Sequence, residues 1–164
     1  EQFTKSKSSL KPITLLTKAA PSYEYTGASM LNDGLRGADE NYKTGRWMGF
    51  QNSDLQAVID LQEMTEVSKA SIRTCINSGD WILDADQFLV ELSDDGENYR
   101  FAGGTESDLS IKTDHWKGVE SHSVIFPKQK ARYVKVTVTN YRQFPKWHGA
   151  NGRAFFFIDE IVVD

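Results

Sequence analysis

The chain ends on an apolar run, residues 155–163, which two adjacent acids interrupt near its middle. Successive side chains of a β-strand point to opposite faces, so we expect Asp159 and Glu160 to lie on opposite faces, each among phenylalanine, isoleucine or valine side chains. An ionised carboxylate in apolar surroundings is costly unless a partner compensates its charge. The run therefore predicts a positive partner for at least one of the two acids, either an arginine or lysine or a bound metal ion.

The rest of the chain consists of short apolar segments separated by turn-forming residues. Besides the closing run, segments that fit strands occur at residues 11–18, 55–61, 67–76, 87–93, 99–101, 119–126 and 132–138, and residues 46–50 are expected to re-enter the core. The sequence DDGEN at residues 94–98 indicates a hairpin. No segment sustains an apolar period of 3.6 residues over a dozen positions, as a helix would. The pattern predicts an all-β fold, an antiparallel β-sandwich or jelly roll of about eight strands.

A single domain accounts for most of the chain. With 39% hydrophobic residues among 164, the sequence can form one substantial core, and disorder is not expected outside the ends. Residues 1–10 are polar and predict a loose arm or linker, which leaves residues 11–164 as the domain. A chain that opens on EQFTKSKSS without methionine is typical of a piece cut from something longer, so a missing signal peptide indicates nothing about compartment.

Charge and cysteine content exclude several classes of function. The net charge of −4, with no dense block of lysine and arginine, argues against nucleic acid or an anionic membrane as a partner. Cys75 is the single cysteine, which excludes an internal disulfide and a Cys/His zinc site of the usual spacing.

The sequence carries no recognisable catalytic constellation. Glycosidases need two carboxyl groups about 5–9.5 Å apart that face one substrate, and the expected opposite orientations of Asp159 and Glu160 prevent this. Nucleophile elbows, phosphate-binding glycine loops and two-histidine metal motifs are also missing from the sequence. We therefore predict a domain that is not itself an enzyme.

Residues 27–45 form a glycine-rich loop that could hold a hard metal ion. Calcium takes six to eight oxygen ligands, many of them backbone carbonyls of tightly turned loops. Asp33, in an Asp-Gly turn, could supply a carboxylate opposite Glu160. In the alternative, Asp33 only caps its turn and Glu160 pairs with Arg36 or Arg46.

Several motifs, in order, carry a family resemblance that spans nearly the whole chain from about Ile13. The motifs are LNDG, GRW, VIDL, VELSDDGENY, ARYVKVTV and FIDEIVV. They resemble the discoidin domain, also called coagulation factor 5/8 type C, and the related family 32 carbohydrate-binding modules. The segments RWMGFQNSDLQAVIDL and FPKWHGANGRAFFFIDEIVV are most similar to C-terminal modules of Bacteroidetes β-N-acetylhexosaminidases of the chitobiase type.

The resemblance implies a galactose-binding-like jelly roll with one structural calcium between the first long loop and the last strand. The implied ligands are the carboxylates of Asp33 and Glu160 and the backbone carbonyls of Met30, Leu35 and Asp159. A further position of the set, two residues before a tryptophan, is Thr or Ser in many relatives. Gly45 occupies it here, which removes a side-chain oxygen and leaves the exact ligand set open.

Related modules bind sugars through aromatic residues on loops at one end of the sandwich, because an aromatic face packs on the apolar side of a pyranose ring. The candidates here are Trp147 with His148, Trp116 with His115, and Trp81. The expected ligands are glycans with N-acetylhexosamine or galactose-type sugars.

Each of these aromatic residues also has an interpretation without a ligand. Trp47 and Trp81 are flanked by core-type residues, which favours packing. Trp147 and His148 could anchor their loop, and His122, on a strand between two serines, is predicted to be structural.

Three functions remain for such a domain. The first is a non-catalytic accessory module of a secreted, extracytoplasmic glycoside hydrolase, with the catalytic domain of that enzyme as its neighbour. The second is an architectural β-domain of the same enzyme that binds no sugar. The third, recognition of protein or phospholipid, ranks last because the loops are polar and mixed.

Overall fold

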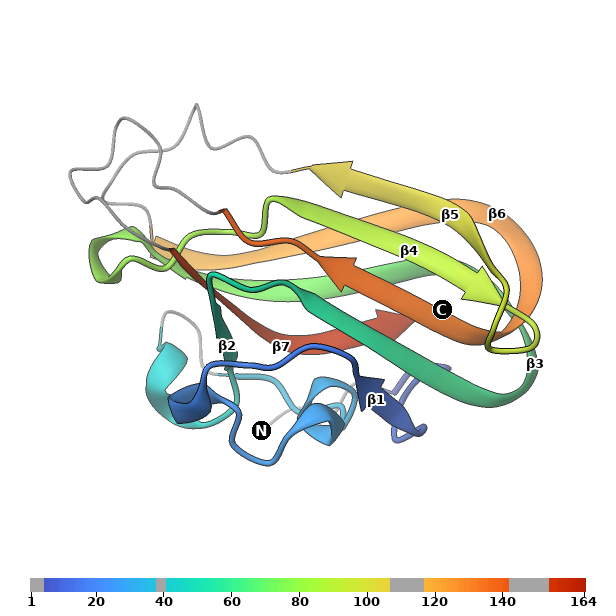
Figure 1. The fold of residues 1–164 in the computed structure, drawn as a ribbon, viewed down its shortest axis with the longest axis horizontal. Helices are drawn as coiled ribbons and strands as arrows, with labels where there is room; N and C mark the ends of the chain where they lie inside the picture. Colours follow the sequence, from blue (N-terminus) through green and yellow to red (C-terminus); the bar gives the residue numbers. More distant parts are fainter. Residues whose placement is uncertain (1–4, 38–40, 107–116, 142–153) are drawn as a thin grey trace.

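The computed structural model describes residues 5–37, 41–106, 117–141 and 154–164 (Figure 1). The strands are β1 (Ile13–Leu15), β2 (Met48–Gln51), β3 (Leu55–Asn77), β4 (Gln87–Ser93), β5 (Tyr99–Glu106), β6 (Lys117–Val138) and β7 (Phe155–Val163). The 3-10 turns are η1 (Pro21–Tyr23), η2 (Ala28–Leu31), η3 (Tyr42–Thr44) and η4 (Ser78–Asp80). The predicted all-β fold is confirmed. Among the described residues, no helix has the length and apolarity needed to cross a bilayer.

The strands pair antiparallel in the order β2-β7-β3-β6-β4-β5, and β1 pairs with β3. β3 and β6 each join two segments that the sequence indicates as separate strands. Figure 1 shows both strands curling round at the same end of the molecule, so that each contributes its first and second halves to different layers. The result is a β-sandwich whose two layers are connected through β3 and β6.

The bend in β3 coincides with a break in its pairing with β6, between Asp60 and Thr65. Gln62 takes a positive φ of 73°, and its N–H donates to Asp60 Oδ1 at 2.7 Å. The Arg132 guanidinium holds the same carboxylate from β6 through two hydrogen bonds of 2.9 and 3.0 Å. A polar cluster thus fixes the curve where the apolar alternation pauses.

The core lies between the layers and follows the predicted alternation. Val134, Val136 and Val138 of β6 are fully buried, while the residues between them are partly exposed. Alternate residues of β3 and β4 complete this side of the core, namely Leu55, Ala57, Ile59, Leu61, Phe88, Val90 and Leu92.

β7 contains an irregularity that changes the orientation of its two acids. Ile158 pairs with Thr74 and Ile161 pairs with Ile72, so three residue steps on β7 match two on β3. Both isoleucines belong to the core, and the two acids between them lie opposite Arg73. The expectation that Asp159 and Glu160 point to opposite faces is therefore wrong. A β-bulge inserts one extra residue and shifts the alternation, so that both carboxyl groups leave the core on the same side.

The segment before β1 packs against the end of β7. Lys7 N–H donates to Val163 O at 3.0 Å, and Val163 N–H donates to the hydroxyl of the buried Ser8, also at 3.0 Å. Asn32 adds a hydrogen bond from its side-chain amide to Ser8 O at 2.9 Å. Although the sequence indicates a loose arm over residues 1–10, the part from Lys7 onward is docked on the domain, because it satisfies backbone groups of β7.

Candidate functional site

Asp159 is the acid of β7 that has an arginine partner. Its side chain is buried, and Oδ2 accepts hydrogen bonds from Arg73 Nη1 and Gly37 N, each at 2.8 Å. Burial raises the pKa of Asp159 to about 6, while the Gly37 hydrogen bond and the charge of Arg73 oppose the shift. The predicted positive partner for at least one of the two acids is therefore confirmed.

Glu160 lies against a second carboxyl group. It is 3% exposed, and Gly34 N–H donates to its Oε1 at 3.0 Å. Burial, followed by a hydrogen bond and negative charge from Asp33, raises the pKa of Glu160 to about 10. In the alternative interpretation Glu160 pairs with Arg36 or Arg46. Arg46 instead lies near Asp33, with Nη1 3.9 Å from Asp33 Oδ2. The predicted proximity of Asp33 and Glu160 is present in the structure.

The segment of residues 28–37 brings Asp33 to β7 through local backbone requirements. Leu35 N–H donates to Asp33 Oδ1 at 2.9 Å, and Gly34 takes a φ of 81°, a left-handed conformation that glycine adopts without strain. A Cβ on Gly37 would lie 2.1 Å from the Trp47 indole nitrogen, so only glycine allows the close approach that aims its N–H at Asp159. The fully buried Trp47, predicted to be a packing residue, forms the wall for this turn.

The donors around Glu160 suit calcium in type. Carboxylate and carbonyl oxygens are the ligands that calcium prefers. Among the described residues no group of three or more His, Cys, Asp or Glu could hold a metal, so most ligands would have to be backbone carbonyls, as the expected set requires. Met30 lies in η2, Leu35 follows the Asp-Gly turn, and Gly45 ends η3 with a φ of 80°.

A second candidate region lies at the end of the sandwich where β3 stops and β7 starts. Trp81 directly follows η4 in a left-handed conformation with a φ of 66°, and its side chain is 49% exposed. Phe155 N–H donates to Trp81 O at 2.9 Å, which ties this residue to β7. The flanking sequence favours packing, but Trp81 is not a core residue: Ile82 and Leu83 are buried, while the turn leaves residue 81 half exposed.

Polar groups gather beside Trp81. Asp80 Oδ2 accepts hydrogen bonds from the Tyr42 hydroxyl at 3.2 Å and from Asn77 Nδ2 at 3.1 Å. Burial, followed by the charge of Asp80, raises the pKa of Tyr42 to about 12, so this phenol keeps its proton and remains a donor. Asp80, Tyr42 and Asn77 are not among the site residues predicted from the sequence, although the NSGD segment before Trp81 was a usable signal.

Aromatic rings form the floor beneath these polar groups. A cavity of about 30 Å³ is lined by Tyr23, Tyr42, Asp80, Ile82, Phe155 and Phe157. The rings of Tyr23 and Phe157, like those of Tyr42 and Phe157, have centroids 4.9 Å apart. This end of the molecule therefore combines an exposed indole, a carboxylate, an amide and a phenol on a rigid aromatic base. The other sugar-site candidates, His115, Trp116, Trp147 and His148, lie outside the described residues.

His122 belongs to a separate buried group. Its Nε2 lies 2.8 Å from both carboxylate oxygens of Asp84, and Thr74 Oγ1 donates to Asp84 Oδ1 at 2.7 Å. Asp84 Oδ1 also accepts the N–H of Ala85 at 2.8 Å. These bonds join the segment before β4 to β3 and β6, in agreement with the predicted structural role of His122.

Comparisons with known proteins identify one matching sequence family and a set of solved structures with the same fold. A sequence model of the F5/8 type C domain matches residues 15–155. No curated protein sequence matches the chain significantly.

Solved structures of carbohydrate-binding modules share the fold at low sequence identity. A fucose binding module of Streptococcus pneumoniae is 20% identical, with a TM-score of 0.58 over 97% of this chain and 94% of its own. A CBM32 module from Clostridium perfringens, solved in complex with GalNAc-β-1,3-galactose, is 17% identical, with a TM-score of 0.57 over 93% of each chain. Chitosan-binding module 1 of a Paenibacillus sp. IK-5 chitosanase/glucanase is 15% identical, with a TM-score of 0.56 over 98% of this chain and 99% of its own.

Proposed function

This chain belongs to the F5/8 type C domain family, and from that premise we propose that it is a non-catalytic carbohydrate-binding module that holds a glycan at the Trp81 end of the sandwich. The structures similar to it include modules described as binding fucose, chitosan or GalNAc-β-1,3-galactose. The expected ligand is a glycan with an N-acetylhexosamine or galactose-type sugar.

The observation that carries the proposal is the half-exposed indole of Trp81 beside the hydrogen-bonded group of Asp80, Asn77 and Tyr42. A pyranose ring has an apolar face that packs on an aromatic ring, and hydroxyls that need fixed donors and acceptors. Asp80 offers acceptor oxygens, and Asn77 has both kinds of group in its amide. Trp116, Trp147 and His148 remain candidates for the same site on sequence grounds.

A structural calcium belongs to the same proposal. Asp33 and Glu160 would contribute carboxylates, and Met30, Leu35, Asp159 and Gly45 backbone carbonyls. Support comes from the buried position of Glu160 against Asp33, where the raised pKa shows that a second negative charge is unfavourable unless a cation compensates it. A bound divalent cation would neutralise this pair and hold the loop of residues 28–37 on β7.

The wider setting is proposed from the resemblance to chitobiase-type modules. The domain would accompany the catalytic domain of an extracytoplasmic β-N-acetylhexosaminidase and keep that enzyme near its substrate. Its own carboxyl groups on β7 are engaged, Asp159 with Arg73 and Gly37, and Glu160 with Gly34 and Asp33. This supports a role in binding without catalysis.

A glycan-array screen of the isolated domain, carried out with calcium and again with a chelator, tests the proposal. We expect retention of a subset of glycans, and loss of that retention in Trp81→Ala. If no glycan is retained under either condition while the domain is folded, the binding function is refuted and an architectural role in the parent enzyme replaces it.

A further inference from the structure

A second cavity lies away from the Trp81 end, on the outer face of the layer formed by β3, β6 and β7. Its volume is about 310 Å³, which falls at the lower limit of the roughly 300–1,000 Å³ typical of small-molecule sites. The lining residues are Arg36, Lys69, Ser71, Ile72, Arg73, Ser121, Ser123, Glu160, Val162 and Asp164. No residue of the Trp81 region contributes to it, so the two regions can be tested separately.

Serine side chains form the floor of this groove. Ser71 of β3 pairs in register with Ser123 of β6, and their hydroxyls lie 2.9 Å apart. Ser121 pairs in register with Arg73 and is exposed. Serine side chains are short, so they leave room for a ligand above the strands, and each hydroxyl can donate as well as accept a hydrogen bond. Such a floor suits a ligand that is itself rich in hydroxyls.

Cations border the floor, and most of the nearby carboxylates are already engaged. Asp159 binds Arg73 and Gly37, and the Glu160 carboxyl faces Gly34 and Asp33. Lys69 is half-buried and Arg36 is exposed, and within the described part of the chain no ion pair engages either of them. Asp164 is the one remaining acid among the lining residues. The groove therefore offers positive charge to a ligand.

The lining also excludes the usual mode of neutral sugar binding. Its apolar members are Ile72 and Val162, and no aromatic ring is among the lining residues. A neutral pyranose would lack a stacking surface there. Guanidinium and ammonium groups instead form strong charge-assisted hydrogen bonds with carboxylates and sulfates.

We propose that this groove is a second carbohydrate subsite that takes an anionic sugar, one that carries a carboxylate or a sulfate ester. Arg36 and Lys69 bind the anionic group, and the serine floor meets the ring hydroxyls. The inference goes beyond the proposed function, because it concerns another face of the domain and a charged class of ligand, and it stands whether or not the Trp81 region binds glycan.

Titration of the ¹⁵N-labelled domain, followed through the backbone amide signals of Ser71 and Ser123, tests the proposal. The probes are methyl β-D-glucuronide and glucose 6-sulfate, with methyl β-D-glucoside and inorganic sulfate as matched neutral and sugar-free probes. We expect shifts with at least one anionic sugar, and markedly weaker effects with the glucoside and with sulfate. Absence of shifts with both anionic sugars up to about 20 mM, well above the millimolar Kd of a weak site, overturns the proposal.

Variants locate the binding. Arg36→Gln and Lys69→Gln should each weaken the anionic sugar by about tenfold, because each removes a charge-assisted hydrogen bond. Lys128→Gln, an equal charge change at an exposed residue outside the groove, should leave the affinity unchanged, and so should Trp81→Ala. The proposal would be overturned if the glucoside or inorganic sulfate bound as tightly as the anionic sugars. It would also be overturned if Lys128→Gln weakened binding as much as Arg36→Gln and Lys69→Gln do.

Discussion

The carboxyl group of Glu160 lies against that of Asp33, and both acids are held by the backbone of one short turn. Gly34 N–H donates to Glu160 Oε1, and Leu35 N–H donates to Asp33 Oδ1. Burial, followed by the hydrogen bond and the negative charge from Asp33, raises the pKa of Glu160 to about 10, so Glu160 keeps its proton when no cation is bound. The pair therefore has two ways to be stable, by keeping a proton or by binding a metal ion.

Glu160→Gln and Asp33→Asn should both abolish stabilisation by calcium. For the parent domain, calcium at 100-fold above Kd adds about 2.7 kcal/mol, which corresponds to roughly 5–10 °C in Tm for a domain of this size. Thermal unfolding of the parent and of each variant, in calcium and in chelator at matched ionic strength, measures the difference in Tm that calcium causes. A parent melting curve that is identical in calcium and chelator would remove the metal from the proposal.

Trp81→Ala should weaken glycan retention by about tenfold, since the loss of about 1.4 kcal/mol of ring contact changes Kd tenfold. Its indole is half exposed, so the domain should remain folded. Affinity electrophoresis against the best glycan from the array measures the effect. Phe101→Ala is the matched control, because Phe101 is also exposed but lies beside the β4–β5 hairpin. Equal loss in the two variants would argue against a site at Trp81.

Asp60→Asn tests the polar cluster at the bend of β3 through its pH dependence. The hydrogen bond from Arg132 is the main cause that lowers the pKa of Asp60 below 3.8. A carboxylate with a lowered folded pKa stabilises the native state above its unfolded pKa, and that contribution is lost as pH falls through the folded value. The parent should therefore be more stable than Asp60→Asn at pH 7, and the difference should shrink below about pH 4. Urea unfolding across this pH range would contradict the idea if the difference stayed constant.

Much of the fold could be predicted because it depends on local alternation. The valines of residues 132–138 are buried as the period of two requires, and the DDGEN turn joins β4 to β5. The approach of Asp33 to Glu160 was predictable only through the metal hypothesis, in which a hard cation needs carboxylates from both the glycine-rich loop and the last strand.

What escaped prediction depends on pairing between distant strands. The bulge at Asp159 and Glu160 exists because β7 spans three residues where β3 spans two, and a single strand's sequence carries no mark of that mismatch. The hydrogen bond between Tyr42 and Asp80 joins residues 38 positions apart, from two turns that the sequence does not relate. Sequence patterns locate strands more readily than they locate contacts between loops.

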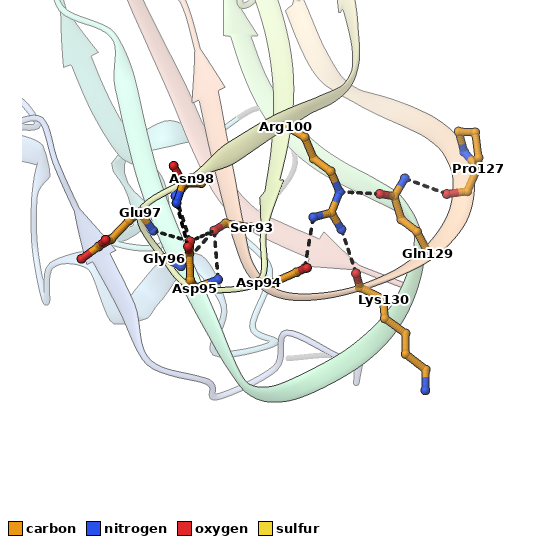
Figure 2. A network of polar contacts seen from close by, with 10 residues as sticks. All are labelled: Ser93, Asp94, Asp95, Gly96, Glu97, Asn98, Arg100, Pro127, Gln129 and Lys130. Carbon is orange, nitrogen blue, oxygen red and sulfur yellow. Dashed lines mark hydrogen bonds and ion pairs between the residues drawn. The ribbon is translucent and has the colours of Figure 1, made fainter.

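Arg100→Ala should destabilise the domain by about 1–2 kcal/mol, because one guanidinium makes three hydrogen bonds at the curled end of the sandwich. Figure 2 shows Arg100 reaching from β5 to Asp94 of the hairpin and to Gln129 and the Lys130 carbonyl of β6, at 3.0, 2.8 and 2.8 Å. The side chain thus ties the β4–β5 hairpin to the bend of β6. Chemical denaturation measures the change in the free energy of unfolding.

Two further variants separate geometry from charge. Arg100→Lys keeps the charge but not the planar group that reaches all three acceptors, so it should recover less than half of the lost stability. Lys128→Ala removes a longer contact of 3.5 Å to Glu66, in which both side chains are mostly exposed, and should cost less than about 0.5 kcal/mol. Full recovery by lysine would mean that charge alone stabilises this end. Partial recovery would identify the directed hydrogen bonds as the link between the hairpin and β6.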